Sequence, residues 1–192
     1  MYTKNQLEKA LKLLGDFLEV EAFHAQLIVC GGAALSITGK VIRTTNDVDV
    51  LALLSDGEVV NARPLPAPIL EASHKVARAL GLQLNWLNEG PADQIRFGFP
   101  DGLKDRLQSV KFGAVLTVLF IGRLDQIHLK LFAAVDQGMG KHVEDLLALE
   151  PTEEEIRIAA LWVSGQDASQ EFSMILRQML SGIGYARIAT NL

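Results

Sequence analysis

The residues best suited to chemistry are two aspartates, Asp47 and Asp49, which lie two positions apart in an otherwise apolar stretch. On an extended strand, residues at this spacing direct their side chains to the same face. Two neighbouring carboxylates repel each other and resist burial, so a divalent cation is the simplest compensating charge. Mg²⁺ commonly uses one or two carboxylates together with substrate phosphates. The alternative is that both aspartates lie at a strand end in water and bind nothing.

A double glycine, Gly31-Gly32, precedes the aspartates and directly follows the apolar run Leu27-Ile28-Val29-Cys30. Glycines between a strand and a short helix allow a phosphate to approach backbone N–H groups closely. A tight turn without any ligand is the alternative interpretation. Cys30, within the apolar run, is expected to be a buried thiol.

The hydrophobic pattern predicts the elements that must position these residues. A helix should follow Thr3, which with Gln6 forms a capping box. Thr152 and Glu155 form a second capping box that opens a late helix. The predicted strands are 27–30, 47–54, 82–87 and 112–121; the predicted helices after the first are 33–38, 69–80, 124–137, 142–149, 152–163 and 168–180; loops are expected over 55–68 and 90–102.

Strands and helices alternate up to about residue 122, and only helices are predicted beyond it. This order indicates an α+β fold with a helical C-terminal third. We expect a core over residues 1–122 and a helical part over 123–192 packed on that core.

The string Gly31-Gly32-Ala33-Ala34-Leu35, followed by Arg43-Thr44-Thr45-Asn46-Asp47-Val48-Asp49-Val50, resembles the nucleotidyltransferase fold superfamily of DNA polymerase β-like enzymes. The string looks like that of the AbiEii-type branch, which includes bacterial toxin nucleotidyltransferases. Downstream, Lys130-Leu131-Phe132-Ala133 and Glu144-Asp145-Leu146 resemble helical elements of the same branch. The resemblance implies a mixed sheet flanked by helices.

The resemblance also implies an activity. A nucleoside monophosphate would pass from a nucleoside triphosphate, ATP among them, to a hydroxyl of an RNA, a protein or a small molecule. Mg²⁺ would be the cofactor, and an antitoxin or toxin protein would be a possible partner. The residues that the resemblance assigns are Asp47 and Asp49 as metal ligands and catalytic residues, Lys130 as a catalytic contact to phosphate or base, and Gly31, Gly32, Ser36 and Arg43 as the nucleotide-binding set.

One feature departs from the superfamily pattern. Its active members usually carry a third carboxylate on a nearby strand, whereas the predicted strands 82–87 and 112–121 contain neither Asp nor Glu. Glu89, Asp93 and Asp125 lie near these strands but outside the expected register. A catalytically inactive member that acts as a binding or antitoxin-like partner is therefore the alternative. A purely structural α+β domain with a solvated Asp-x-Asp is the third possibility.

Composition bounds the remaining function classes. The 192 residues carry 18 Lys and Arg against 23 Asp and Glu, and the resulting charge of −5 excludes a broad basic coat for nucleic acid. The one cysteine excludes an internal disulfide and any site with several thiolates. No apolar run reaches the roughly 18 residues that span a bilayer, and the first residues are polar. A cytoplasmic protein without membrane contact is expected.

Overall fold

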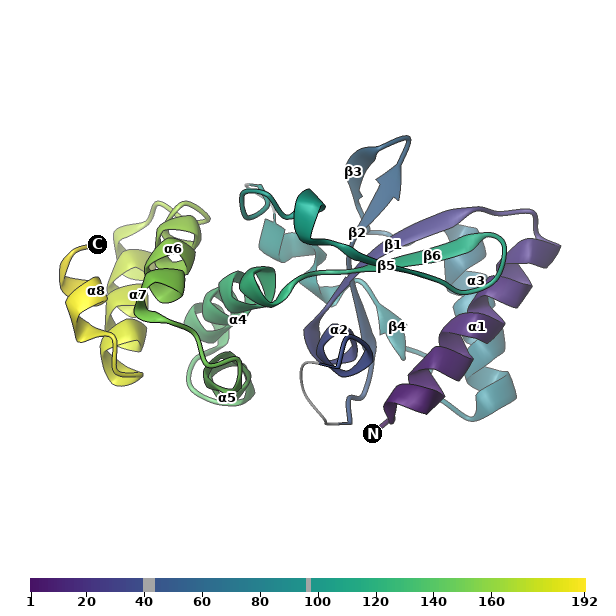
Figure 1. Cartoon of the computed structure of the whole chain (residues 1–192), viewed down its shortest axis with the longest axis horizontal. Helices are drawn as coiled ribbons and strands as arrows, with labels where there is room; N and C mark the ends of the chain where they lie inside the picture. The colour runs from purple at the N-terminus through teal and green to yellow at the C-terminus, as the bar shows by residue number, and fades with distance from the viewer. Residues whose placement is uncertain (40–43, 96–97) are drawn as a thin grey trace. The chain divides into compact units, whose positions relative to one another are not determined.

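The computed structural model describes residues 1–39, 44–95 and 98–192. The chain forms two compact units (Figure 1). Unit 1 comprises Met1–Asp93 and Lys104–Ile121, and unit 2 comprises Gln94–Leu103 and Gly122–Leu192. Unit 1 contains a six-stranded mixed sheet with helices, and the C-terminal part is helical, so the α+β prediction is confirmed.

The sheet of unit 1 has the strand order β3-β2-β1-β6-β5, and β4 pairs with β2 off this path. Strands β1 and β6 are parallel, as are β2 and β4, whereas the other pairs are antiparallel. The central strands are buried because their sequences are nearly continuous apolar runs. The strands are β1 (Ala25–Cys30), β2 (Val48–Ser55), β3 (Glu58–Asn61), β4 (Leu87–Asn88), β5 (Gln108–Lys111) and β6 (Leu116–Phe120).

The expected loop over 55–68 is wrong in its first part, since β2 and β3 form a hairpin there. The turn residues Asp56 and Gly57 have φ values of 52° and 79°. A two-residue hairpin turn with positive φ at both positions is the geometry that Asp-Gly favours. Pro64, Pro66 and Pro68, which favour a loop, follow only after β3 has ended.

Two strand predictions are also corrected. The apolar run 112–121 begins as a hairpin turn, in which the Phe112 N–H donates to the Leu116 carbonyl and Gly113 has a φ of 89°. The other arm of that hairpin, β5, is polar and exposed along its whole length, so hydrophobic patterning misses it. In the segment 82–87 only Leu87 joins the sheet, as the first residue of β4.

Helices α1 (Lys4–Val20), α2 (Gly31–Ile37) and α3 (Ala67–Leu80) complete unit 1, together with a short 3₁₀ turn at Lys104–Arg106. A second 3₁₀ turn, Gly90–Ile95, begins in unit 1 and ends with Gln94 and Ile95 of unit 2. The Thr3–Gln6 capping box opens α1, and Gly81, with a φ of 66°, ends α3. Helix α2 begins two residues earlier than predicted. Helices α1 and α3 are in contact.

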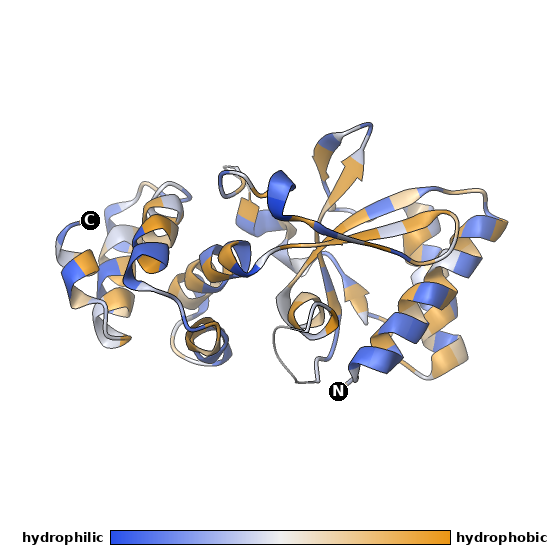
Figure 2. Ribbon diagram, in the orientation of Figure 1, coloured by the Kyte–Doolittle hydropathy of each residue, from blue (hydrophilic) through white to orange (hydrophobic). Residues whose placement is uncertain are grey.

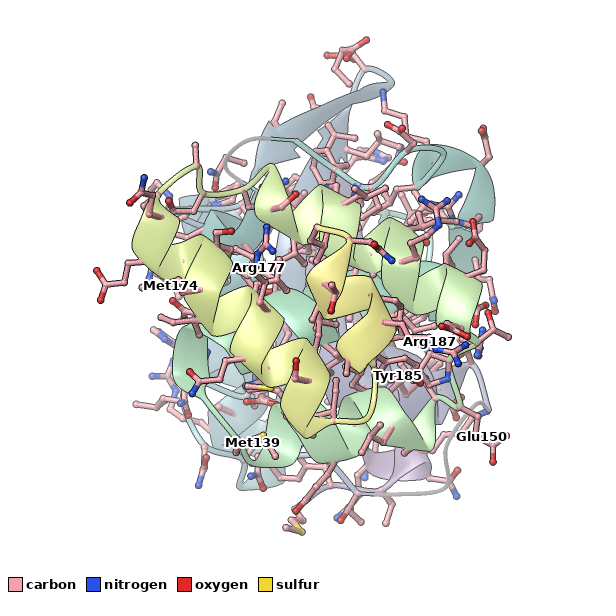
Figure 3. The ribbon with its side chains drawn as sticks, turned by 90° about the vertical axis from the view of Figure 1, so that its left-hand side faces the viewer. Met139, Glu150, Met174, Arg177, Tyr185 and Arg187 are labelled. Carbon is pink, nitrogen blue, oxygen red and sulfur yellow. The ribbon has the colours of Figure 1, made fainter. Side chains whose placement is uncertain are left out.

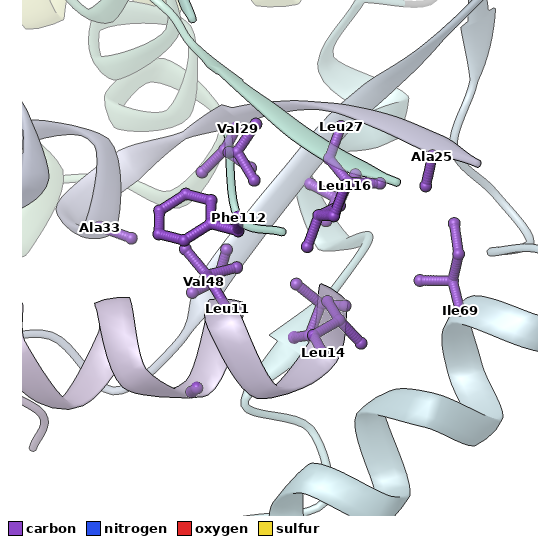
Figure 4. Close-up of a cluster of buried hydrophobic side chains, with 14 of the residues drawn as sticks. Leu11, Leu14, Ala25, Leu27, Val29, Ala33, Val48, Ile69, Phe112 and Leu116 are labelled. Carbon is purple, nitrogen blue, oxygen red and sulfur yellow. The ribbon is translucent and has the colours of Figure 1, made fainter. Parts of the chain in front are cut away.

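The core of unit 1 lies between helix side chains and the sheet (Figure 4). Leu11 and Leu14 of α1 are fully buried there with Leu27 and Leu116 of β1 and β6. Burying a leucine side chain stabilises the fold by roughly 1.5–3 kcal/mol. Figure 2 shows these strands as mainly hydrophobic, whereas hydrophilic residues run along one side of α1.

Unit 2 is built from α4 (Arg123–Gln137), α5 (Lys141–Ala148), α6 (Glu153–Ser164), α7 (Gln170–Gly182) and α8 (Ala186–Thr190), and α8 was not predicted. Tyr185, which is labelled in Figure 3, donates from its hydroxyl to the Pro151 carbonyl at 3.2 Å. No helix within the described ranges is both long enough and apolar enough to cross a membrane.

Arg123 links the start of α4 to the start of α6 within unit 2. Its Nη2 donates to Glu155 Oε2 at 3.1 Å, and its Nε donates to the Leu149 carbonyl at 2.9 Å. Glu155 also closes the capping box with Thr152. The hydrogen bonds from Arg123 lower the pKa of Glu155 below its ordinary value, so this carboxylate stays charged into the acid range.

Candidate active site

The first contact of the candidate site joins Asp49 to the double-glycine turn. Cys30 ends β1 opposite Asp49 of β2, and α2 begins at Gly31. A Cβ atom at Gly31 would lie 2.4 Å from Asp49 Oδ2, and Gly31 has a φ of +71°. Both facts favour glycine here, because other residues rarely adopt this φ and any Cβ would displace the Asp49 carboxylate. The Asp49 carboxylate therefore lies directly against the turn.

The second contact brings in a residue that the sequence analysis did not single out. Strand β4 runs parallel to β2 with Asn88 in register with Asp49. Asn88 Nδ2 donates to Asp49 Oδ1 at 3.1 Å, and Asn88 Oδ1 accepts from the Gly90 N–H at 2.9 Å. The predicted strand 82–87 ended one residue before Asn88, so the apolar pattern gave no sign of this partner.

Asp47 lies immediately before β2. Its Oδ1 accepts from the Thr45 hydroxyl at 3.4 Å. Along the chain Asp47 is half-buried, Val48 buried, Asp49 half-buried and Val50 buried. This alternation is typical of a strand with one buried face and one partly exposed face. It indicates that the side chains of both aspartates lie on the partly exposed face.

The other residues of the predicted nucleotide-binding set differ in their surroundings. Gly32 and Ser36 are buried within α2, where Ser36 is only 7% exposed. Arg43 lies outside the described residues. The expectation of a buried thiol is confirmed at Cys30, which is 4% exposed.

The fit of this site to a metal can be judged from its ligand chemistry. Within residues 1–39, 44–95 and 98–192, no group of three or more His, Cys, Asp or Glu side chains could hold a metal ion. The two aspartates are hard oxygen donors, and the Asp49 carboxylate lies where a side chain at Gly31 would begin. Two carboxylates suit a Mg²⁺ ion that takes its other ligands from phosphates and water.

Lys130 belongs to unit 2 and has a partner there. Its Nζ lies 2.7 Å from Asp145 Oδ2, and the two side chains are 9% and 2% exposed. The pair joins α4 to α5 inside unit 2. Removing one partner of such a buried ion pair strongly destabilises the folded protein, because the other charge stays buried without compensation. The proposed contact of Lys130 with phosphate or base stays a prediction.

The acidic residues near the strands have different positions. Glu89 is half-buried beside β4, and Asp93 pairs with Arg63 in unit 1. Asp125 is fully buried in α4 of unit 2. His142 is bonded through Nε2 to Gln137 at 3.0 Å.

Comparison with known proteins matches the chain to a protein family. Residues 6–148 match the model of a family described as nucleotidyltransferase of unknown function (DUF6036). Neither the curated proteins nor the solved structures contain a match to this chain. The matched range covers about three quarters of the chain and includes Gly31, Asp49, Asn88 and Lys130. The assignment to the AbiEii-type branch stays a prediction. The chain belongs to the DUF6036 family of nucleotidyltransferases of unknown function.

Proposed function

We propose that this protein is a Mg²⁺-dependent enzyme that transfers a nucleoside monophosphate from a nucleoside triphosphate to a hydroxyl group. The observation that carries the proposal is the contact between the Asp49 carboxylate and the Gly31 turn. The carboxylate that would ligate the cation then lies beside a turn whose two residues carry no side chain. A triphosphate with its cation needs both features together.

In this proposal Asp47 and Asp49 hold the cation, and the glycine turn receives the phosphates. When bound, Mg²⁺ neutralises phosphate charge and stabilises the charge that develops in the transition state. The acceptor hydroxyl oxygen forms a bond to the α-phosphorus, the bond to the bridging oxygen of the β-phosphate breaks, and pyrophosphate leaves. The hydroxyl proton passes to water. The residues of the chain thus contribute mainly positioning and electrostatics.

The identity of the acceptor rests on the resemblance alone. We propose a hydroxyl of RNA, protein or a small molecule, and a toxin or antitoxin protein as partner. Cytoplasmic localisation is likewise an expectation from the sequence. Lys130, which is paired with Asp145, is proposed to contact phosphate or base.

A second candidate is a member of the family that binds nucleotide or a partner protein without catalysis. The observation that favours it is the neutral side chain of Asn88 beside Asp49, where a third carboxylate would complete an acidic cluster. If such a protein binds nucleotide, it does so without releasing pyrophosphate.

The test combines calorimetry with a transfer assay. Titration of the full chain with each nucleoside triphosphate and Mg²⁺ should give binding that weakens at least about tenfold in Asp47→Asn and Asp49→Asn. Asp56→Asn, in the exposed β2–β3 turn, is the matched control and should bind as the parent does.

An α-labelled triphosphate incubated with cellular RNA and protein should then label an acceptor. Binding without labelling or pyrophosphate release supports the second candidate. Absence of binding with Mg²⁺, Mn²⁺ and every nucleotide contradicts the proposed enzyme and leaves only the binding of a partner protein, which a pull-down would test.

A further inference from the structure

Asn88 has two hydrogen bonds that fix how its side chain is turned. The Gly90 N–H can only donate, so the atom that faces it at 2.9 Å is the amide oxygen. The amide nitrogen therefore faces Asp49, and it donates to Oδ1 at 3.1 Å. The two contacts agree with each other and leave one orientation of the amide.

The Asn88 bond acts on the same carboxylate that touches the glycine turn. Asn88 holds Oδ1 of Asp49, and the other oxygen, Oδ2, lies against Gly31. The backbone of Asp49 is also held on both sides, by β1 and by β4. The hydrogen bond from Asn88 thus restrains the rotation of this carboxylate.

We propose that Asn88 is a positioning residue of the site, which directs Asp49 toward the glycine turn for the nucleotide-bound cation. This inference rests on the proposed function. Because Asn88 is neutral, the site carries the two negative charges of Asp47 and Asp49 before a ligand arrives. The free protein then binds Mg²⁺ alone weakly, and the cation enters with the triphosphate.

The first experiment uses Mg²⁺ without nucleotide. In Asn88→Asp, a carboxylate keeps the bond from Gly90 but places an oxygen opposite Asp49 Oδ1 at about the 3.1 Å of the present bond. Without metal, its melting temperature should fall by about 4 °C or more. Millimolar Mg²⁺ alone should restore it, whereas the parent protein should respond little.

The matched control is Asn85→Asp, which adds the same charge at an exposed position three residues earlier. Its melting temperature should not depend on Mg²⁺. A residue with only a structural role would give a loss in Asn88→Asp that Mg²⁺ does not restore, and that result overturns the inference.

The second experiment uses Asn88→Ala, which removes both bonds without adding charge. Affinity for the Mg²⁺–triphosphate complex should fall about tenfold or more, with the circular dichroism spectrum unchanged. Unchanged affinity overturns the inference. If Asn88→Asp does not fold under any condition, this measurement decides alone.

The two proposals fail in different ways. If the parent protein binds no nucleotide, the proposed function fails. The Mg²⁺ response of Asn88→Asp then still tests whether Asn88 faces the carboxylate of Asp49 in a cation site.

Discussion

Gly31 offers the sharpest test of the site, because alanine there has two separable costs. The first is backbone strain, since a non-glycine residue at a φ of +71° costs about 1–2 kcal/mol. The second is steric. The new Cβ would lie 2.4 Å from Asp49 Oδ2, and the carboxylate must move by about 1 Å to restore ordinary contact.

That movement breaks the bond from Asn88, which is 3.1 Å long. A hydrogen bond to a charged group contributes about 1.5–3 kcal/mol, and because Asp49 is half-buried the lower part of this range applies. We therefore expect Gly31→Ala to lower the free energy of unfolding by about 2.5–4 kcal/mol in total. Affinity for a Mg²⁺–triphosphate complex should fall with it.

Gly81→Ala is the matched control. Gly81 has a φ of +66° and no heavy atom within 4 Å of its would-be Cβ, so it carries the strain without the steric clash. Urea unfolding should give a loss of about 1–2 kcal/mol for Gly81→Ala, and nucleotide binding should be retained. Equal losses in the two variants, with equal nucleotide binding, would refute the reasoning about Asp49.

Two further predictions concern unit 2. Lys130→Met leaves Asp145 buried without its ammonium partner, so unfolding free energy should fall by about 3–5 kcal/mol, and the double variant with Asp145→Leu should regain much of it in the same urea assay. If the double variant lost as much unfolding free energy as Lys130→Met alone, the uncompensated charge of Asp145 would not be the cause of the loss. The pKa of Glu155 is lowered in the folded protein, so the stabilisation from its carboxylate is complete above its ordinary pKa and is lost as pH falls through its folded pKa. Glu155→Gln should therefore lower the free energy of unfolding by about 1 kcal/mol near neutral pH and by much less below that folded pKa. Melting temperatures of both proteins measured across an acid titration will show this difference.

The sequence predicted those elements whose signals are local. Thr3 with Gln6 and Thr152 with Glu155 form the expected capping boxes, because a cap involves residues only three positions apart. Gly81 ends its helix for the same reason. The apolar runs that became β1 and β2 were also found, since buried strands need continuous hydrophobic sequence.

Elements that depend on distant partners were missed. Strand β5 is polar and exposed, so only its pairing with β6 reveals it. The pairing of Asn88 with Asp49, which are 39 residues apart in the chain, depends on the register between β4 and β2. No spacing rule links such positions in a single sequence. Only the family resemblance brought Asp49 and Gly31 together in the sequence analysis. Their contact itself depends on the pairing of β1 with β2, which the sequence does not show.

The pairing of β2 with β4 has a practical consequence for recognising related proteins. A fragment that ended before Leu87 would retain the whole Gly-Gly and Asp-x-Asp signature, yet it would lack the amide that orients one of the carboxylates. Surveys that count genes by the signature alone would therefore include chains unable to assemble this arrangement. A sounder criterion asks whether a later segment supplies a hydrogen-bond donor, or a third ligand, in register with the second aspartate.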